Sequence, residues 1–128
     1  MPANDTFEPL FRNAARVRRV SRQLAPLLRN VYDTVDGEAA ALRAALEELV
    51  AFLTTPAGRT DANLCVTDAF FSGIEGWGKP LAGIPPALRA IINDLGGALH
   101  DTIYAPHIAS NFESLPEQLL ERLRKISV

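Results

Sequence analysis

Apolar residues recur at spacings of three and four along most of this chain, which is the periodicity of amphipathic α-helices. From about residue 7 to residue 32 the pattern predicts one long helix. Pro26 lacks an amide hydrogen and clashes with the preceding turn, so we expect it to kink the helix or to split it in two near Ala25. The apolar positions of this helix are Leu10, Ala14, Val17, Val20, Leu24, Leu27, Leu28 and Val31.

A second helix is predicted after Asp36, whose carboxylate is a suitable N-cap, and it should end near Thr55, before Pro56. Its buried stripe is expected to consist of Leu42, Leu46, Leu49, Val50 and Leu53, with Arg43, Glu47 and Glu48 in solvent. A shorter third helix is predicted from a Thr60 cap to Gly73.

The stretch of about residues 72–85 contains four glycines, Pro80 and the only tryptophan, Trp77, and it shows no regular periodicity. It predicts a loop of about a dozen residues, a length that is more often functional or mobile than merely connecting. In this position Trp77 is either a contact residue for a partner or an anchor that holds the loop on the core.

Two further helices complete the pattern. One is predicted from Pro86 to Ile103, because its apolar stripe continues through Gly96-Gly97. The last is predicted to open with Ser114-Leu115-Pro116-Glu117, which fits a capping box, and to bury Leu119, Leu120, Leu123 and Ile126. The whole chain, residues 1–128, therefore predicts a single all-α domain, an up-and-down bundle of four to five helices with one long Gly/Pro-rich loop at about 72–85.

Composition agrees with a globular domain, since 48% of the residues are hydrophobic and 22% are charged. No apolar run is long enough to span a bilayer, and the N-terminal sequence lacks the features of a secretory signal, so we expect a cytoplasmic protein. Cys65 is the only cysteine, which excludes a disulfide within one chain.

Motifs for phosphate-binding loops, nucleophile elbows and paired-histidine zinc sites are missing from the sequence. Asp61-Ala62-Asn63 begins like a calcium loop, but Cys65 and Val66 stand where an oxygen ligand and a glycine belong. His100-Asp101 is similar to the paired ligands of HD-type metal phosphohydrolases, yet no histidine lies upstream to complete that metal shell. The sequence therefore predicts no metal site and no cofactor.

One helix face does combine polar and aromatic groups. Steps of three and four bring Asn93, Gly97, His100 and Tyr104 together, with Asp94 and Asp101 beside them. As a functional site, Asn93, His100, Asp101 and Tyr104 would form a ligand pocket, with a divalent metal if Asp94 and Asp101 turned towards one point. The favoured interpretation is packing, because a glycine pair inside a helix usually marks close contact with another helix.

Cys65 has two interpretations as well. It is either a nucleophile paired with His100 or a small buried hydrophobic residue, and its neighbours Leu64 and Val66 favour burial.

Charge is distributed unevenly along the chain. Residues 1–32 carry six arginines against Asp5 and Glu8, a balance of +4, whereas residues 33–128 carry seven basic and thirteen acidic side chains, a balance of −6. Helical spacing places Arg12, Arg16 and Arg19 on one side, with Arg18, Arg22 and Arg29 beside them. This arginine face is either a docking surface for an acidic partner or a solvated face that pairs with Glu47, Glu48 or the last helix.

Two functions are therefore predicted. The first is a small non-enzymatic protein-binding domain, similar in size and class to adaptor or immunity proteins, that docks through Arg12, Arg16, Arg19 and Arg22 or through Trp77. Its partner is expected to be another protein or a second copy in a homodimer. Nucleic acid is not expected, because lysines and exposed aromatics do not accompany the arginines. The alternative is a small hydrolase or ligand-binding domain that uses the His100 face.

Overall fold

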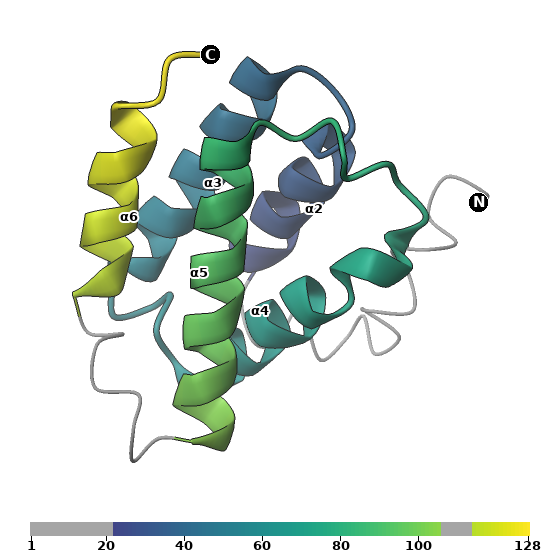
Figure 1. Cartoon of the computed structure of the whole chain (residues 1–128). Helices are drawn as coiled ribbons and strands as arrows, with labels where there is room; N and C mark the ends of the chain where they lie inside the picture. The colour runs from purple at the N-terminus through teal and green to yellow at the C-terminus, as the bar shows by residue number, and fades with distance from the viewer. Residues whose placement is uncertain (1–21, 106–113) are drawn as a thin grey trace.

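The computed structural model describes residues 22–105 and 114–128, and within them the chain forms five α-helices, one short 3-10 helix and no strand. The elements are α2 (Leu24–Thr34), α3 (Ala39–Leu53), α4 (Asp61–Ser72), the 3-10 helix η3 (Ile74–Trp77), α5 (Pro86–Tyr104) and α6 (Leu115–Arg124). The predicted all-α helical bundle is confirmed for this part of the chain (Figure 1).

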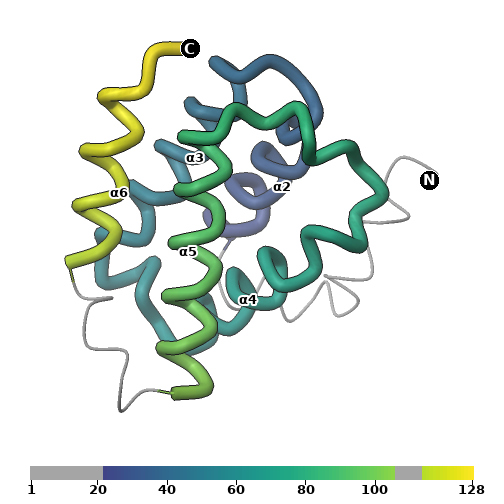
Figure 2. The backbone as a smooth tube through the Cα atoms, viewed as in Figure 1, coloured from purple at the N-terminus to yellow at the C-terminus, as the bar shows by residue number. Residues whose placement is uncertain are grey.

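The bundle is built from two pairs of consecutive helices and a final helix that joins them. α2 packs on α3, and α4 packs on α5. α6 lies beside both α3 and α5, so it closes the gap between the two pairs (Figure 2). The main neighbours of α3 are thus α2 and α6, whereas α4 packs chiefly on α5.

The core is rich in leucine and is formed by facing stripes of the helices. The central positions, each no more than 3% exposed, are Leu42, Leu46, Leu49, Val50 and Leu53 of α3 and Leu88, Ile91, Ile92, Leu95 and Leu99 of α5. These are the stripes that the spacing predicts. α5 also runs without interruption through Gly96-Gly97, as expected.

Of the two outcomes predicted at Pro26, a kink or a split, the described residues show a helix start just before the proline. α2 begins at Leu24 after a turn at residues 22–23, so Pro26 lies in the first helical turn. Amides in that turn have no intrahelical acceptor, and proline therefore costs the helix no hydrogen bond there. The predicted part of this helix from residue 7 to residue 21 lies outside the described residues.

Only one of the three predicted helix caps forms. Thr60 accepts a hydrogen bond from the amide of Asn63 at 3.2 Å, as predicted. The prediction for Asp36 is wrong, because α3 starts after Glu38 and the Asp36 carboxylate lies 3.3 Å from Lys79 instead. The predicted capping box is also wrong, because Ser114 caps no amide and Glu117 pairs with Arg59 at 3.0 Å.

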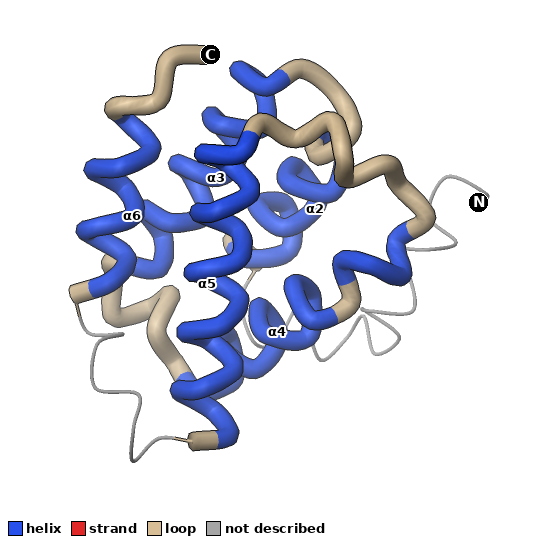
Figure 3. The backbone as a smooth tube through the Cα atoms, viewed as in Figure 1, coloured by secondary structure: helices blue, strands red, loops and turns tan. Residues whose placement is uncertain are grey.

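The predicted irregular loop at about 72–85 is partly ordered into a helix. η3 follows α4 after Gly73 and ends at Trp77, and the next residue, Gly78, has a φ of 75° in the left-handed region that glycine tolerates best. The remaining stretch, 78–85, crosses the ends of α2 and α3 before it enters α5 (Figure 3). The segment is therefore attached to the bundle at both ends.

Trp77→Ala should lower the free energy of unfolding by about 3–5 kcal/mol, because it removes a large buried side chain and leaves a cavity. The side chain is only 2% exposed. Urea denaturation followed by circular dichroism measures the change. Tyr104→Ala, at a ring that is 67% exposed, is the matched control and should leave stability almost unchanged. Equal stabilities of the two variants would contradict an anchoring role for Trp77.

Candidate functional site

The arginine face falls mostly outside the described residues. Arg12, Arg16 and Arg19 belong to the segment before residue 22, so their role as a docking surface stays a prediction. Arg22 is described, and it is exposed in the turn that precedes α2.

Trp77 is not a surface contact residue, which corrects its place among the predicted docking residues. Its ring lies 4.5 Å from Phe70 and 5.2 Å from Tyr32, measured between ring centroids. The indole therefore joins η3 to α4 and α2 inside the core, and it presents no face to a partner.

Two adjoining pockets form a groove between α4 and the C-terminal half of α5. Both pockets are lined by Cys65 and Ile103, so the two hollows lie side by side along the helix pair. We call it the α4–α5 groove. Its lining residues are Asp61, Leu64, Cys65, Asp68, Ala69 and Ser72 from α4 and His100, Thr102, Ile103 and Tyr104 from α5.

His100 faces a buried carboxylate across the groove. Its Nδ1 lies 3.7 Å from Oδ1 of Asp68, a side chain that is 7% exposed, while the imidazole itself is 58% exposed. The same carboxylate oxygen accepts a hydrogen bond from the Ser72 hydroxyl at 3.4 Å. The separation of 3.7 Å is an ion-pair distance and is too long for a hydrogen bond. The acidic neighbour of His100 is thus Asp68, not the adjacent Asp101.

Tyr104 stands at the rim of the groove. Its ring is 67% exposed, and its centroid lies 4.7 Å from that of His100, with the two planes tilted by 39°. Two of the four residues predicted as a ligand pocket, His100 and Tyr104, therefore line one site. The other two, Asn93 and Asp101, are exposed on α5 but do not line the groove.

The predicted polar face of α5 is divided between two neighbours. Asp94 accepts a hydrogen bond from Arg122 of α6 at 2.8 Å, so it is directed away from His100. Asp94 and Asp101 are not brought together, and no group of three His, Cys, Asp or Glu side chains in the described part of the chain is arranged to hold a metal ion. The groove offers an imidazole, a thiol and carboxylates instead.

The glycine pair has two different surroundings. A β-carbon built on Gly96 would lie 3.5 Å from Cβ of Phe71, so this glycine faces α4 across the helix contact. A β-carbon on Gly97 would meet nothing within 4 Å. Only Gly96 thus marks a helix contact, and even there an added methyl group would make an ordinary van der Waals contact.

Cys65 is exposed, and the favoured interpretation of a buried hydrophobic residue is wrong. The core-facing side of α4 is defined by its buried Leu64, Thr67, Phe70 and Phe71. Cys65, Ala69 and Ser72, at steps of four and three, therefore share the opposite side and line the groove. The role of Asp68 in the groove was not predicted for the same reason, because apolar periodicity does not indicate that a carboxylate lies at the edge of a core.

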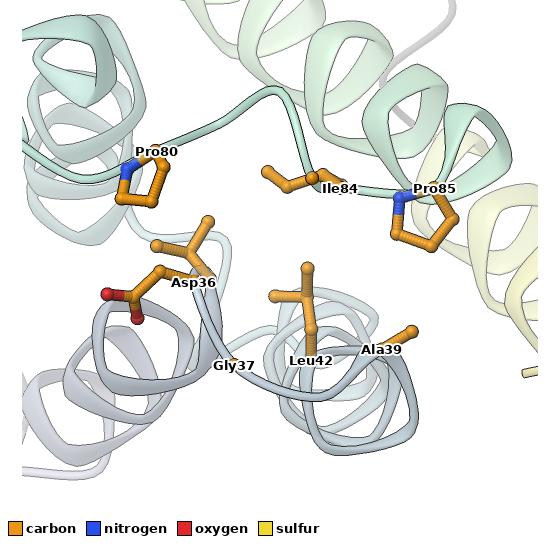
Figure 4. A pocket seen from close by; sticks show the side chains of 9 residues that line it. Asp36, Gly37, Ala39, Leu42, Pro80, Ile84 and Pro85 are labelled. Carbon is orange, nitrogen blue, oxygen red and sulfur yellow. The ribbon is translucent and has the colours of Figure 1, made fainter.

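A third pocket lies at the other end of the bundle and is a packing seam. Residues of the α2–α3 turn meet the segment before α5 there, and Leu42 and Ile84 point towards one another (Figure 4). The acid in its lining, Asp36, is held by Lys79, whose ammonium group lies 4.0 Å from the centre of the Tyr32 ring. We ascribe to this pocket the role of fixing the 78–85 segment.

No protein-family model, curated protein or solved structure matches the chain. Among the described helices, none is long and apolar enough to cross a membrane.

Cys65 should react with a thiol reagent such as DTNB in the folded protein. Its exposure predicts a rate within about tenfold of the rate in urea, because access controls thiol reaction as much as ionisation does. Absorbance at the released thiolate measures the rate, and Cys65→Ser is the blank. A thiol that reacts only after unfolding would show that Cys65 is buried.

Gly97→Ala should stabilise the protein by about 1 kcal/mol, because alanine favours the helix and the added methyl group meets no neighbouring atom. Thermal unfolding measures the gain. A loss of stability would show that the face around Gly97 is covered by another part of the molecule.

Proposed function

We propose that this chain is a non-enzymatic protein-binding domain whose contact surface is the α4–α5 groove. The observation that carries the proposal is the Tyr104 ring, which is 67% exposed at the rim of a groove and lies beside His100. Tyrosine is enriched among the residues that contribute most to binding at protein interfaces, because it offers a large rigid surface and one polar group.

The lining of the groove supports a protein partner. Leu64 and Ile103 provide an apolar floor, and Ala69 adds a small apolar side chain to the lining. Exposed polar groups surround this floor, among them the Cys65 thiol, the Ser72 hydroxyl and the His100 imidazole. An apolar centre with a polar rim is the usual composition of a protein interface.

A second candidate function, a small hydrolase or ligand-binding domain, is favoured by one observation. Cys65, Asp68 and His100 line the same pocket, and these are residue types that supply a nucleophile, an orienting acid and a base. No hydrogen bond joins the thiol to the imidazole in the described residues, although an activated pair needs about 2.6–3.2 Å between them. We therefore propose binding, rather than catalysis, as the function of the groove.

The arginine segment remains a separate proposal for the docking surface. Arg12, Arg16 and Arg19 carry charge that no acidic residue between Pro9 and Tyr32 neutralises, so an acidic partner protein would be attracted to them. The experiment must distinguish this segment from the groove.

Tyr104→Ala should weaken capture of the native partner by at least about tenfold, because an interface hot spot contributes about 2 kcal/mol or more. The measurement is affinity capture from the native extract, followed by titration of the captured protein against each variant. Val128→Ala is the matched control, because Val128 is the other large apolar side chain exposed in the described part of the chain.

A variant with Arg12, Arg16 and Arg19 changed to Glu is tested in parallel. Retention of the partner by this variant and loss by Tyr104→Ala would support the groove. Loss of the partner in the arginine variant alone would show that the docking surface is the N-terminal segment. If Cys65→Ser or His100→Ala abolished hydrolysis of a small ester while capture was unchanged, the second candidate would replace the first.

A further inference from the structure

We infer that the partner in the α4–α5 groove is an α-helix that presents two basic side chains seven residues apart. The inference rests on the proposed function and specifies the chemistry of the partner. It follows from the position of two carboxylates along α4, from the charge around them and from the apolar surface between them.

Asp61 and Asp68 lie at opposite ends of the groove. Asp61 lines the pocket that contains Thr102, and Asp68 lines the pocket that contains His100 and Ser72. Seven residues are almost two complete helical turns, so the two positions share one side of α4 and lie about 10 Å apart along its axis. The groove thus has one carboxylate at each end.

Neither carboxylate is neutralised by lysine or arginine within the described residues. Seven other carboxylates pair with a lysine or arginine there, namely Asp33, Asp36, Glu47, Glu75, Asp94, Glu117 and Glu121. Asp61 has no such pair, a property that it shares with Glu38, Glu48 and Asp101, and the basic side chain nearest the Asp68 carboxylate is the His100 imidazole at 3.7 Å. No lysine or arginine lines either pocket. The groove is therefore an acidic strip that attracts positive charge.

Between the two carboxylates the groove is mainly apolar. Cys65 and Ile103 are common to both pockets, and Leu64 and Ala69 continue the apolar floor. A partner helix with basic residues at i and i+7 places the side chains at i+3 and i+4 against this floor, since these four positions share one face. Tyr104 stands at the Asp68 end, where its ring can stack on the second cation.

The sign of the charge and the spacing together fit a basic helix. A nucleic acid or an anionic membrane surface would be repelled by the two carboxylates, and a single small amine would reach only one of them. A helix bridges both ends with the same rise per residue as α4 itself, so its cations match the carboxylates without strain.

The test uses synthetic helical peptides and the full chain. One fluorescent peptide carries arginine at i and i+7 with leucine at i+3 and i+4, a second has the arginines at i and i+5, and a third replaces one arginine by citrulline. Binding is measured by anisotropy. Protection of Cys65 from alkylation is an independent readout, because this residue lines both pockets.

We expect the i, i+7 peptide to bind and to slow the alkylation of Cys65. The other two peptides should bind about tenfold more weakly, since one charge-assisted hydrogen bond is lost. Asp61→Asn should weaken the i, i+7 peptide by a similar factor. Asp68→Asn should do the same, and because Asp68 is buried its folding is checked by circular dichroism. Asp101→Asn is the matched control, since this exposed carboxylate on α5 does not line the groove.

Equal binding of all three peptides, or equal weakening by Asp61→Asn and Asp101→Asn, would overturn the inference in favour of a diffuse negative field. Faster alkylation of Cys65 in the variant with Arg12, Arg16 and Arg19 changed to Glu would overturn it in favour of the chain's own arginines as the occupant. If none of the peptides binds while Tyr104→Ala still abolishes capture of the native partner, the inference of a helical partner is wrong and the binding function stands. If Tyr104→Ala retains the native partner, the binding function itself fails.

Discussion

The orientation of α4 depends on two adjacent aromatic residues at its C-terminal end. Phe70 packs against Trp77 at 4.5 Å between ring centroids, and Trp77 in turn contacts Tyr32 of α2. Phe71 lies over Gly96 of α5. Because these contacts hold α4 on both neighbours, they fix which side of the helix faces the core. The outward position of Cys65, Ala69 and Ser72 follows from this orientation, and so does the groove.

Asp68 is the one charged side chain among the buried residues that the structure describes. Burial of a carboxylate costs several kcal/mol unless hydrogen bonds and an opposite charge offset it. Here the offset is incomplete, since Ser72 donates at 3.4 Å and His100 stands 3.7 Å away. The carboxylate is thus a polar group in the lining of the groove that its neighbours only partly compensate.

The buried side of a helix could be predicted from the sequence where large apolar residues lie on one side of the helix and polar residues on the other. The leucine stripes of α3 and α5 and the Thr60 cap could be predicted from spacing, because the large apolar side chains of those two helices lie on one side. α4 lacks such contrast, since it buries Asn63, Thr67 and Asp68 and exposes Cys65 and Ala69. Small apolar residues on the outside and polar residues on the inside make periodicity misleading. The groove could not be predicted for this reason.

The failed caps have a related cause. Asp36 and Glu117 were each predicted to cap the start of a helix. Each instead pairs with a cation distant in sequence, Asp36 with Lys79 and Glu117 with Arg59. Such pairs depend on how the helices meet, which local sequence does not specify. Both pairs are partly exposed, at 24% and 57% for Arg59 and Glu117 and at 18% and 35% for Lys79 and Asp36, so solvent screens part of their attraction. They do, however, engage the Lys79 and Arg59 side chains, and neither of these side chains lines the groove. Since none of these cations reaches the groove, the negative charge of Asp61 and Asp68 remains available to a partner.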